Sequence, residues 1–166
     1  MDKFEYHKNN VEFKDIRMFC DYFGYTLQDA SNNKFDRADY IIREKGWIVE
    51  LKSRYFNLRT LKEQYNSEII IEIDKFEAVL KRAAETDLTP IYITKLSDGW
   101  FFVYNLLNIP QEDLKVERIS APKSTLGNKT YITKFVYKLK TDYPTNILFT
   151  KQITEEKLND KLNAKK

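Results

Sequence analysis

Two short runs of strand-forming residues, joined by a break that contains glycine, constrain the fold most strongly. The runs cover Ala38–Arg43 and Trp47–Lys52, and Gly46 lies in the break between them. Valine, isoleucine, tyrosine and tryptophan favour strands, and a short Gly-containing break is typical of the turn between antiparallel strands. The segment therefore predicts a β-hairpin, in which successive side chains point to opposite faces.

An amphipathic helix is expected before the hairpin, over about Val11–Phe23. Its apolar residues follow the i, i+3, i+4, i+7 spacing of one buried face, and Gly24 is suited to end it. Glu12 falls on the same inward stripe. The other expected elements are strands at Tyr25–Gln28, Pro90–Thr94, Trp100–Tyr104, Lys115–Ile119 and Thr130–Leu139, a helix with Asp74 as N-cap, and a strand or helix entry at Glu68–Glu72, while Arg54–Ser67 has no assigned structure.

Length and apolar content predict one folded domain. The chain has 166 residues, of which 42% are hydrophobic, and domains run to about 100–200 residues. We expect a mixed α/β domain over 1–153, with a core over about 11–105, a β-rich extension over about 111–150 and a charged tail over 154–166. No apolar run approaches the roughly 20 residues of a membrane-spanning helix, and the N-terminus does not resemble a secretory signal. A cytoplasmic location without membrane contact is the expectation.

Composition excludes several kinds of site. Cys20 is the only cysteine and His7 the only histidine, which excludes a disulfide framework and a cysteine-based zinc site and argues against a Ser-His-Asp triad. Lysine and arginine number 28 against 25 acidic residues, so the net charge is only +3. This balance excludes a histone-like polycation but permits a local basic patch. Any metal must be held by carboxylates.

The hairpin concentrates the residues suited to chemistry. Glu50 and Lys52 share one strand face because side chains alternate. Asp39 joins them if the turn has an even number of residues: a four-residue turn places it opposite Glu50, and a two-residue turn places it opposite Lys52. An odd turn would put Asp39 on the far face. The cluster therefore depends on turn parity.

Two carboxylates and a lysine on one face suit metal-assisted hydrolysis. The carboxylates of Asp39 and Glu50 repel one another unless a cation lies between them, and hard oxygen ligands suit Mg²⁺ or Mn²⁺. Lys52 can orient water or neutralise charge that develops on a phosphate. Glu12 can add a further ligand from the first helix, and Lys75, at the start of the Asp74 helix, can meet a phosphate oxygen.

The pattern of Asp39 followed by Glu50-Leu51-Lys52, behind a helix that carries Glu12, resembles the PD-(D/E)XK nuclease superfamily with its restriction-endonuclease-like fold. The resemblance covers roughly the first 95 residues. It implies a central mixed sheet flanked by helices, Asp39 and Glu50 as metal-binding acids, Lys52 as catalytic lysine, and Glu12 as the first-helix glutamate of some branches. Ala38 replaces the proline of the motif.

The resemblance implies a Mg²⁺- or Mn²⁺-dependent nuclease that acts on nucleic acid, DNA ahead of RNA, and that forms a homodimer if both strands of a duplex are cut. The alternative is a nuclease-like domain that binds nucleic acid or a protein partner without cutting. The plainest alternative for Glu50 and Lys52 is an ordinary ion pair on a solvated strand face. Arg54 and Lys75 are candidate nucleic-acid contacts. Arg54 belongs to a basic and aromatic surface that also includes Lys45, Tyr55, Phe56, Arg59, Lys62 and Tyr65.

Overall fold

The computed structural model describes residues 3–29, 40–122, 130–141 and 146–149. Within these ranges, a six-stranded sheet forms the centre of the molecule, in the order β1-β2-β3-β5-β6-β9. β3 and β5 are parallel, and the other neighbouring strands are antiparallel, so the sheet is mixed. The strands are β1 (Leu27–Asp29), β2 (Tyr40–Ile42), β3 (Trp47–Ser53), β5 (Thr89–Lys95), β6 (Trp100–Asn105) and β9 (Asn146–Phe149).

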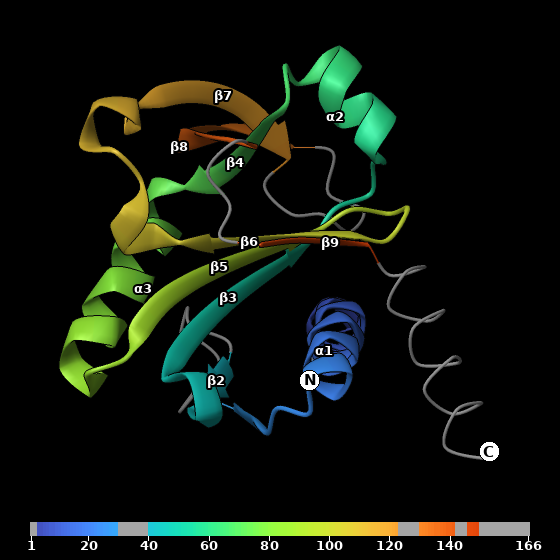
Figure 1. The fold of residues 1–166 in the computed structure, drawn as a ribbon. Coiled ribbons are helices and arrows are strands. Elements are labelled where there is room, and N and C mark those ends of the chain that lie inside the picture. Colours follow the sequence, from blue (N-terminus) through green and yellow to red (C-terminus); the bar gives the residue numbers. More distant parts are fainter. Residues whose placement is uncertain (1–2, 30–39, 123–129, 142–145, 150–166) are drawn as a thin grey trace.

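A smaller sheet and the helices cover the central sheet. The second sheet has the order β4-β8-β7, with β4 at Glu68–Glu72, β8 at Tyr131–Lys140 and β7 at Glu117–Pro122. Figure 1 shows α1 on one side of the central sheet, and α2 with the second sheet on the other. The helices are α1 (Lys3–Phe23), α2 (Leu58–Gln64) and α3 (Ile73–Thr86), with 3₁₀ turns at Arg43–Lys45, Leu106–Asn108 and Gln111–Asp113.

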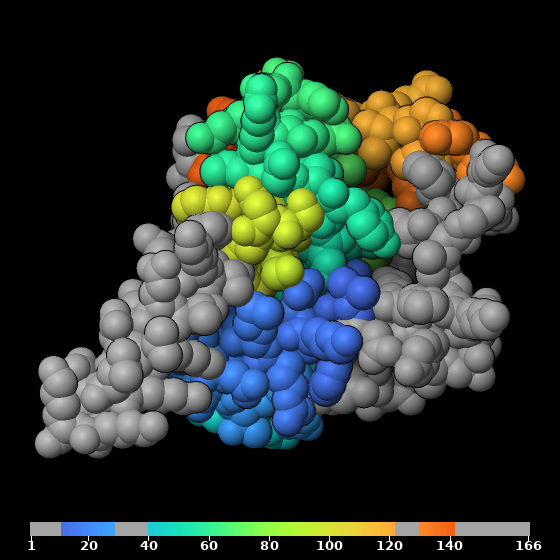
Figure 2. All heavy atoms as spheres, turned by 90° about the vertical axis from the view of Figure 1, so that its right-hand side faces the viewer, coloured from blue at the N-terminus to red at the C-terminus, as the bar shows by residue number. Residues whose placement is uncertain are grey.

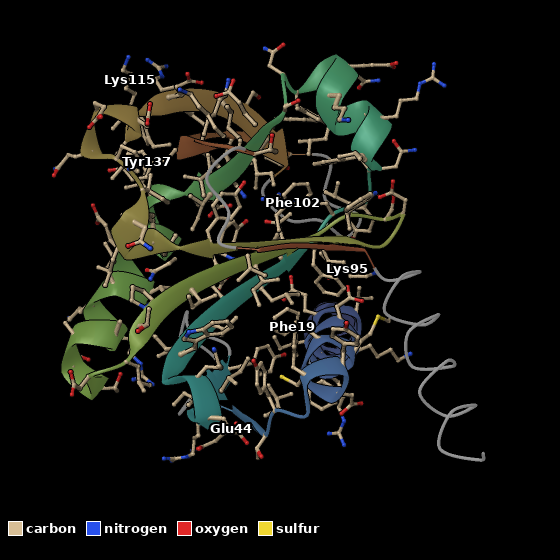
Figure 3. All side chains as sticks on the ribbon, viewed as in Figure 1. Phe19, Glu44, Lys95, Phe102, Lys115 and Tyr137 are labelled. Carbon is tan, nitrogen blue, oxygen red and sulfur yellow. The ribbon has the colours of Figure 1, made fainter. Side chains whose placement is uncertain are left out.

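Each face of the central sheet has its own hydrophobic core. Ile16, Phe19 and Cys20 of α1 pack with Val49 and Leu51 on one face. On the other face, residues of α3, β4 and β8 pack with alternate residues of β3, β5 and β6. In Figure 3, Phe19 and Phe102 lie on opposite sides of the sheet, in agreement with their separate cores. Burial raises the pKa of the Cys20 thiol to about 12, so this cysteine is a neutral core residue.

The helices extend or shift the predicted boundaries. α1 ends at Phe23 as expected, and Gly24 takes the left-handed φ of +72°. It begins at Lys3 rather than near Val11, because the apolar stripe used for the prediction starts later than the helix itself. The prediction of Asp74 as N-cap of α3 is wrong by two residues: Glu72 has extended backbone at the cap position, and Asp74 lies in the first turn.

The predicted hairpin is present, and its turn contains four residues. Tyr40 pairs with Val49 and Ile42 with Trp47, so the cross-strand sums are odd, as the even-turn argument required. A 3₁₀ turn followed by Gly46 at φ +62° closes the connection. Asp39 lies outside the described residues, and its place opposite Glu50 stays a prediction.

The link between the two sheets contains Arg54–Ser67, which had no assigned structure, and Glu68–Glu72, which was expected to be a strand or the entry to a helix. The Asn57 side chain caps α2 by accepting a hydrogen bond from the Thr60 amide at 2.9 Å. Glu68–Glu72 is a strand, β4, and it pairs with β8. The predicted tail and the domain end at 153 lie outside the described ranges. Among the helices described here, none is long and apolar enough to cross a membrane.

Candidate active site

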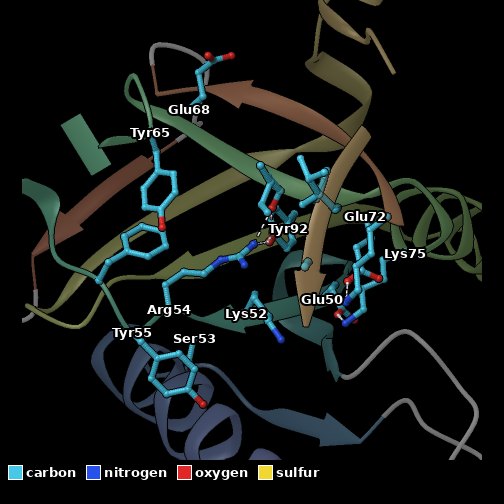
Figure 4. Close-up of a pocket in the computed structure, with 16 residues that line it drawn as sticks. Glu50, Lys52, Ser53, Arg54, Tyr55, Tyr65, Glu68, Glu72, Lys75 and Tyr92 are labelled. Atoms are coloured by element: carbon cyan, nitrogen blue, oxygen red, sulfur yellow. Dashed lines mark hydrogen bonds and ion pairs between the residues drawn. The ribbon is translucent and has the colours of Figure 1, made fainter. Parts of the chain in front are cut away.

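A cavity of about 400 Å³ lies between the two sheets, at the middle and end of β3 (Figure 4). Parallel pairing puts Tyr92 of β5 beside Glu50. The cavity therefore has the central sheet as one wall, and the second sheet closes it from the other side. Its lining includes Glu50 and Lys52 from β3, Tyr92 from β5, Ile70 and Glu72 from β4, and Lys134 from β8.

Glu50 is a buried carboxylate with one oxygen paired and one unpaired. Only 2% of the residue is exposed. Its Oε1 accepts a hydrogen bond from the Lys75 ammonium at 3.0 Å, whereas its Oε2 has no hydrogen-bond partner among the described residues. A buried carboxylate oxygen without a donor is costly, so this atom is suited to bind a cation or a proton. The solvated strand face that was the plainest alternative is excluded for Glu50.

Lys52 lies two residues further along the same face of β3. Its ammonium is 3.9 Å from Oε1 of Glu12, and its side chain is 22% exposed. Glu12 is buried, at 6% exposure, as its position on the inward stripe of α1 predicted. The structure thus brings Glu12 to Lys52 and Lys75 to Glu50, and the contact of Lys75 with a phosphate stays a prediction.

A second buried acid on α1, Asp15, was missed in the sequence. Asp15 accepts a hydrogen bond from the Ser53 hydroxyl at 2.5 Å and lies 3.1 Å from the Lys95 ammonium. These contacts join α1 to the ends of β3 and β5. Figure 2 shows the blue surface of α1 directly below a yellow-green part of the central sheet. The signal was available, because Asp15 precedes Ile16 and follows Glu12 by three positions on one helix face.

The cavity is also lined by an ion pair, Glu72 and Lys134, that local sequence patterns did not predict. Lys134 donates a hydrogen bond to Glu72 at 2.8 Å. Burial alone would raise the pKa of Glu72, but the hydrogen bond and charge of Lys134, with the charges of Lys75 and Lys52, hold it below its usual value. The two residues are 62 positions apart, so no local pattern could have linked them.

The predicted basic and aromatic surface divides in two. Arg54, Tyr55, Phe56 and Tyr65 line the cavity. The remaining cations lie elsewhere: Arg59 and Lys62 are exposed on α2, and Lys45 lies over the Trp47 ring at the other end of β3.

The described residues alone do not form a complete carboxylate metal centre. Within them, no three His, Cys, Asp or Glu side chains are grouped so as to hold a metal ion. Of the two predicted metal-binding acids, Glu50 lies within the described residues, and the position of Asp39 remains a prediction. The Lys75 contact occupies one oxygen of Glu50 but does not fill the cavity in front of it.

Comparison with known proteins identifies the fold. No protein-family model matches the sequence, and no curated protein sequence matches it significantly. The structure is similar to that of Hjc, a Holliday junction resolvase from the archaeal hyperthermophile Archaeoglobus fulgidus, with a TM-score of 0.51 and 12% identity over 86% of this chain and 91% of that one. Hjc is a member of the PD-(D/E)XK nuclease superfamily. The chain has the restriction-endonuclease-like fold, as the sequence predicted.

Proposed function

We propose that the chain is a metal-dependent nuclease that hydrolyses phosphodiester bonds, with Asp39 and Glu50 as metal-binding acids and Lys52 as catalytic lysine. The observation that carries the proposal is the buried carboxylate of Glu50, which has one unpartnered oxygen and lines a cavity next to the Lys52 ammonium. The likeness of the fold to a Holliday junction resolvase supports the class of activity.

A divalent cation fits the chemistry of this position. Oε2 of Glu50 is buried and lacks a donor in the described part of the chain, and a buried anionic oxygen needs a positive partner. Carboxylate oxygens are the ligands that Mg²⁺ and Mn²⁺ prefer. The four-residue turn supports Asp39 as the second ligand, because a turn of this length extends the register of β2 and β3 to Asp39 opposite Glu50.

The chain's own residues have distinct tasks in this proposal. A bound divalent ion supplies Lewis-acid activation of water and of the scissile phosphate. Lys52, which is reached from solvent, donates from Nζ to a phosphate oxygen and neutralises the charge that develops there. Glu12 holds the Lys52 ammonium in position. Lys75 lowers the electrostatic cost of the buried Glu50 charge.

The proposed substrate is DNA ahead of RNA, and the proposed assembly is a homodimer where both strands of a duplex are cut. The solved structure that resembles this chain is a Holliday junction resolvase by its title, and a Holliday junction is made of DNA, which supports this order of substrates. A cytoplasmic location is part of the proposal, since nucleic acid is available there.

The test is cleavage of plasmid, linear duplex and single-stranded DNA and of RNA, each with Mg²⁺, with Mn²⁺ and with a chelator. We expect metal-dependent cleavage that falls at least about 100-fold in Glu50→Gln and in Lys52→Met, because each removes a group that acts on the reacting phosphate. Glu77→Gln, an exposed acid on α3, is the matched control and should cleave like the wild type. Equal background cleavage by all four proteins would refute the enzyme proposal.

One observation favours the alternative of a domain that binds without cutting. Both described candidate acids already lie near a lysine, Glu50 beside Lys75 and Glu12 beside Lys52. In a domain that only binds, the lysines already balance the charges of these two acids, and no metal ion is needed. Titration with Mn²⁺ separates the two functions: the nuclease takes up the ion and loses affinity for it in Glu50→Gln, whereas the binding domain shows no uptake that depends on Glu50.

A further inference from the structure

The cavity extends well beyond Glu50 and Lys52. At about 400 Å³ it falls in the size range of pockets that hold one small organic ligand, about 300–1,000 Å³. Nothing in the proposed hydrolysis requires this volume, because a metal ion, a water molecule and a phosphate need only the part near Glu50. The rest of the cavity therefore has room for a further part of the substrate.

The walls away from Glu50 are aromatic and aliphatic. The Tyr65 ring packs on Phe56 with ring centres 4.8 Å apart. Phe56 in turn packs against the core, so the ring pair has a fixed support. Tyr65 remains 47% exposed and lines the cavity. An exposed ring on a rigid support is suited to stack against a flat, apolar group.

Arg54 lies in the same wall and is fixed by the protein. Its Nη2 donates to the Ile70 carbonyl at 2.6 Å and to the Tyr92 hydroxyl at 3.0 Å. Figure 4 shows its side chain reaching across the cavity toward Tyr92. Both hydrogen bonds that the structure gives to this guanidinium use the same nitrogen, so the other nitrogens can meet a ligand in the cavity.

Three ammonium groups, each beside a carboxylate, lie where the cavity meets the candidate active site. The ammonium groups of Lys52, Lys75 and Lys134 all come from residues of the lining, and their side chains are 22%, 23% and 24% exposed. A ligand that combines a phosphate with a flat apolar ring would match cations at one end and aromatic rings at the other. A nucleotide has this combination.

We propose that the cavity takes one unpaired nucleotide of the substrate strand, with the base against Tyr65 and Phe56 and the phosphate toward Lys52. This inference rests on the proposed function and names its substrate class: nucleic acid with an unpaired nucleotide beside the cut. A cavity of this volume admits one nucleotide but not a base pair within a duplex. Extruding a base from a duplex costs free energy, and the cost is least where the base is already unpaired.

The test measures binding in the presence of a chelator, so that it does not depend on cleavage. Fluorescein-labelled duplexes, fully paired or with one unpaired 5-iodouracil, are titrated with the full chain and followed by anisotropy. We expect about 10-fold tighter binding of the duplex with the unpaired nucleotide, and ultraviolet cross-linking of the iodouracil to the segment that contains Tyr65. Tyr65→Leu should abolish the preference. Tyr131→Leu should keep it, because Tyr131 is 65% exposed but does not line the cavity.

Each other outcome overturns the inference. Equal affinity for the two duplexes, a preference that survives in Tyr65→Leu, or a cross-link outside the cavity would each do so. Competition by free 5-iodo-dUMP as strong as by the oligonucleotide would show that the cavity takes a free nucleotide instead of a strand. The proposed function is tested separately. If the chain prefers the unpaired nucleotide but shows no metal-dependent cleavage, the cavity still binds a nucleotide and the nuclease proposal is refuted. If it cleaves with metal but shows no preference, the nuclease proposal stands and the role of the cavity is refuted.

Discussion

The ammonium of Lys75 at the start of α3 lies 3.0 Å from Oε1 of Glu50 in the middle of β3. The contact joins an element that crosses one face of the central sheet to the strand that carries the candidate acid. The contact also makes the two carboxylate oxygens of Glu50 different. Oε1 accepts a hydrogen bond from Lys75, whereas Oε2 has no hydrogen-bond partner among the described residues and is available for a cation.

Replacing Lys75 by methionine tests this relationship. Removing one partner of a buried pair leaves an uncompensated charge, which costs about 3–5 kcal/mol when both groups are fully buried. Because the Lys75 side chain is 23% exposed, we expect a smaller loss of about 1–3 kcal/mol in the free energy of unfolding measured with urea. Adding Glu50→Gln should recover part of it. Lys81→Met, an exposed lysine on α3, should change stability little, and an equal loss in both lysine variants would contradict the pairing.

Glu12 should matter to activity more than to folding. Glu12→Gln keeps the shape of the side chain but weakens its hold on the Lys52 ammonium, so we expect kcat/KM to fall about 10- to 100-fold, as for other residues that position a catalytic group. Circular dichroism should show an unchanged fold. Asp21→Asn, an exposed acid on α1, is the control. Full activity of Glu12→Gln would remove Glu12 from the site.

The Glu72–Lys134 pair predicts a dependence of stability on pH. The pKa of Glu72 in the folded chain is below its usual value of 4.5. The unfolded chain therefore binds the proton first as the pH falls, so the contribution of Glu72 is complete above about pH 4.5 and is lost below it. Thermal unfolding between pH 3 and pH 7 should show a smaller drop in Tm on acidification for Glu72→Gln than for the wild type. Parallel curves would count against the pair.

Packing between the second sheet and the core should stabilise the whole domain. Ile69 of β4 is 1% exposed, and truncation of such a residue to alanine costs about 2–5 kcal/mol. Ile132 of β8 is 37% exposed, and the same truncation should cost about 1 kcal/mol or less. Urea unfolding of both variants measures the difference. If Ile69→Ala were as mild as Ile132→Ala, the second sheet would not be an integral part of the core.

The sequence predicted the elements whose signals are local. The strand at Trp47–Lys52, the inward position of Glu12 and the helix end at Phe23 each follow from periodicity or a nearby glycine, and the structure has all three. The resemblance to a known fold followed from Asp39 and Glu50-Leu51-Lys52 together with the order of the expected helices and strands. What the sequence could not show is the pairing of β4 with β8, because strands so far apart leave no shared pattern.

The second sheet explains the limits of the site prediction. The cavity exists only because β4 and β8 lie over the central sheet, so Glu72 and Lys134 could not be linked to Glu50 in advance. The pairing of Lys75 with Glu50 was not expected either, since it arises because α3 packs on β3, and the expected phosphate contact of Lys75 stays a prediction. Asp15 is different, since its helical spacing from Glu12 was visible and was overlooked.

Asp15 provides the last prediction, because it fixes the helix that carries Glu12. It contacts the Ser53 hydroxyl and the Lys95 ammonium, at the ends of two neighbouring parallel strands. Asp15→Asn removes the charge that pairs with Lys95, and we expect a loss of about 1–3 kcal/mol in the free energy of unfolding.

The same substitution should also reduce kcat/KM, by less than Glu12→Gln does, because α1 would hold Glu12 over Lys52 less firmly. The double variant Asp15→Asn/Lys95→Met distinguishes the charge pair from a general weakening of α1. It should unfold at nearly the same urea concentration as Asp15→Asn alone, since both changes remove one interaction. Additive losses in the double variant would show that Asp15 and Lys95 act independently. The hydrogen bond from Ser53 would then be the contact by which Asp15 holds α1 to β3.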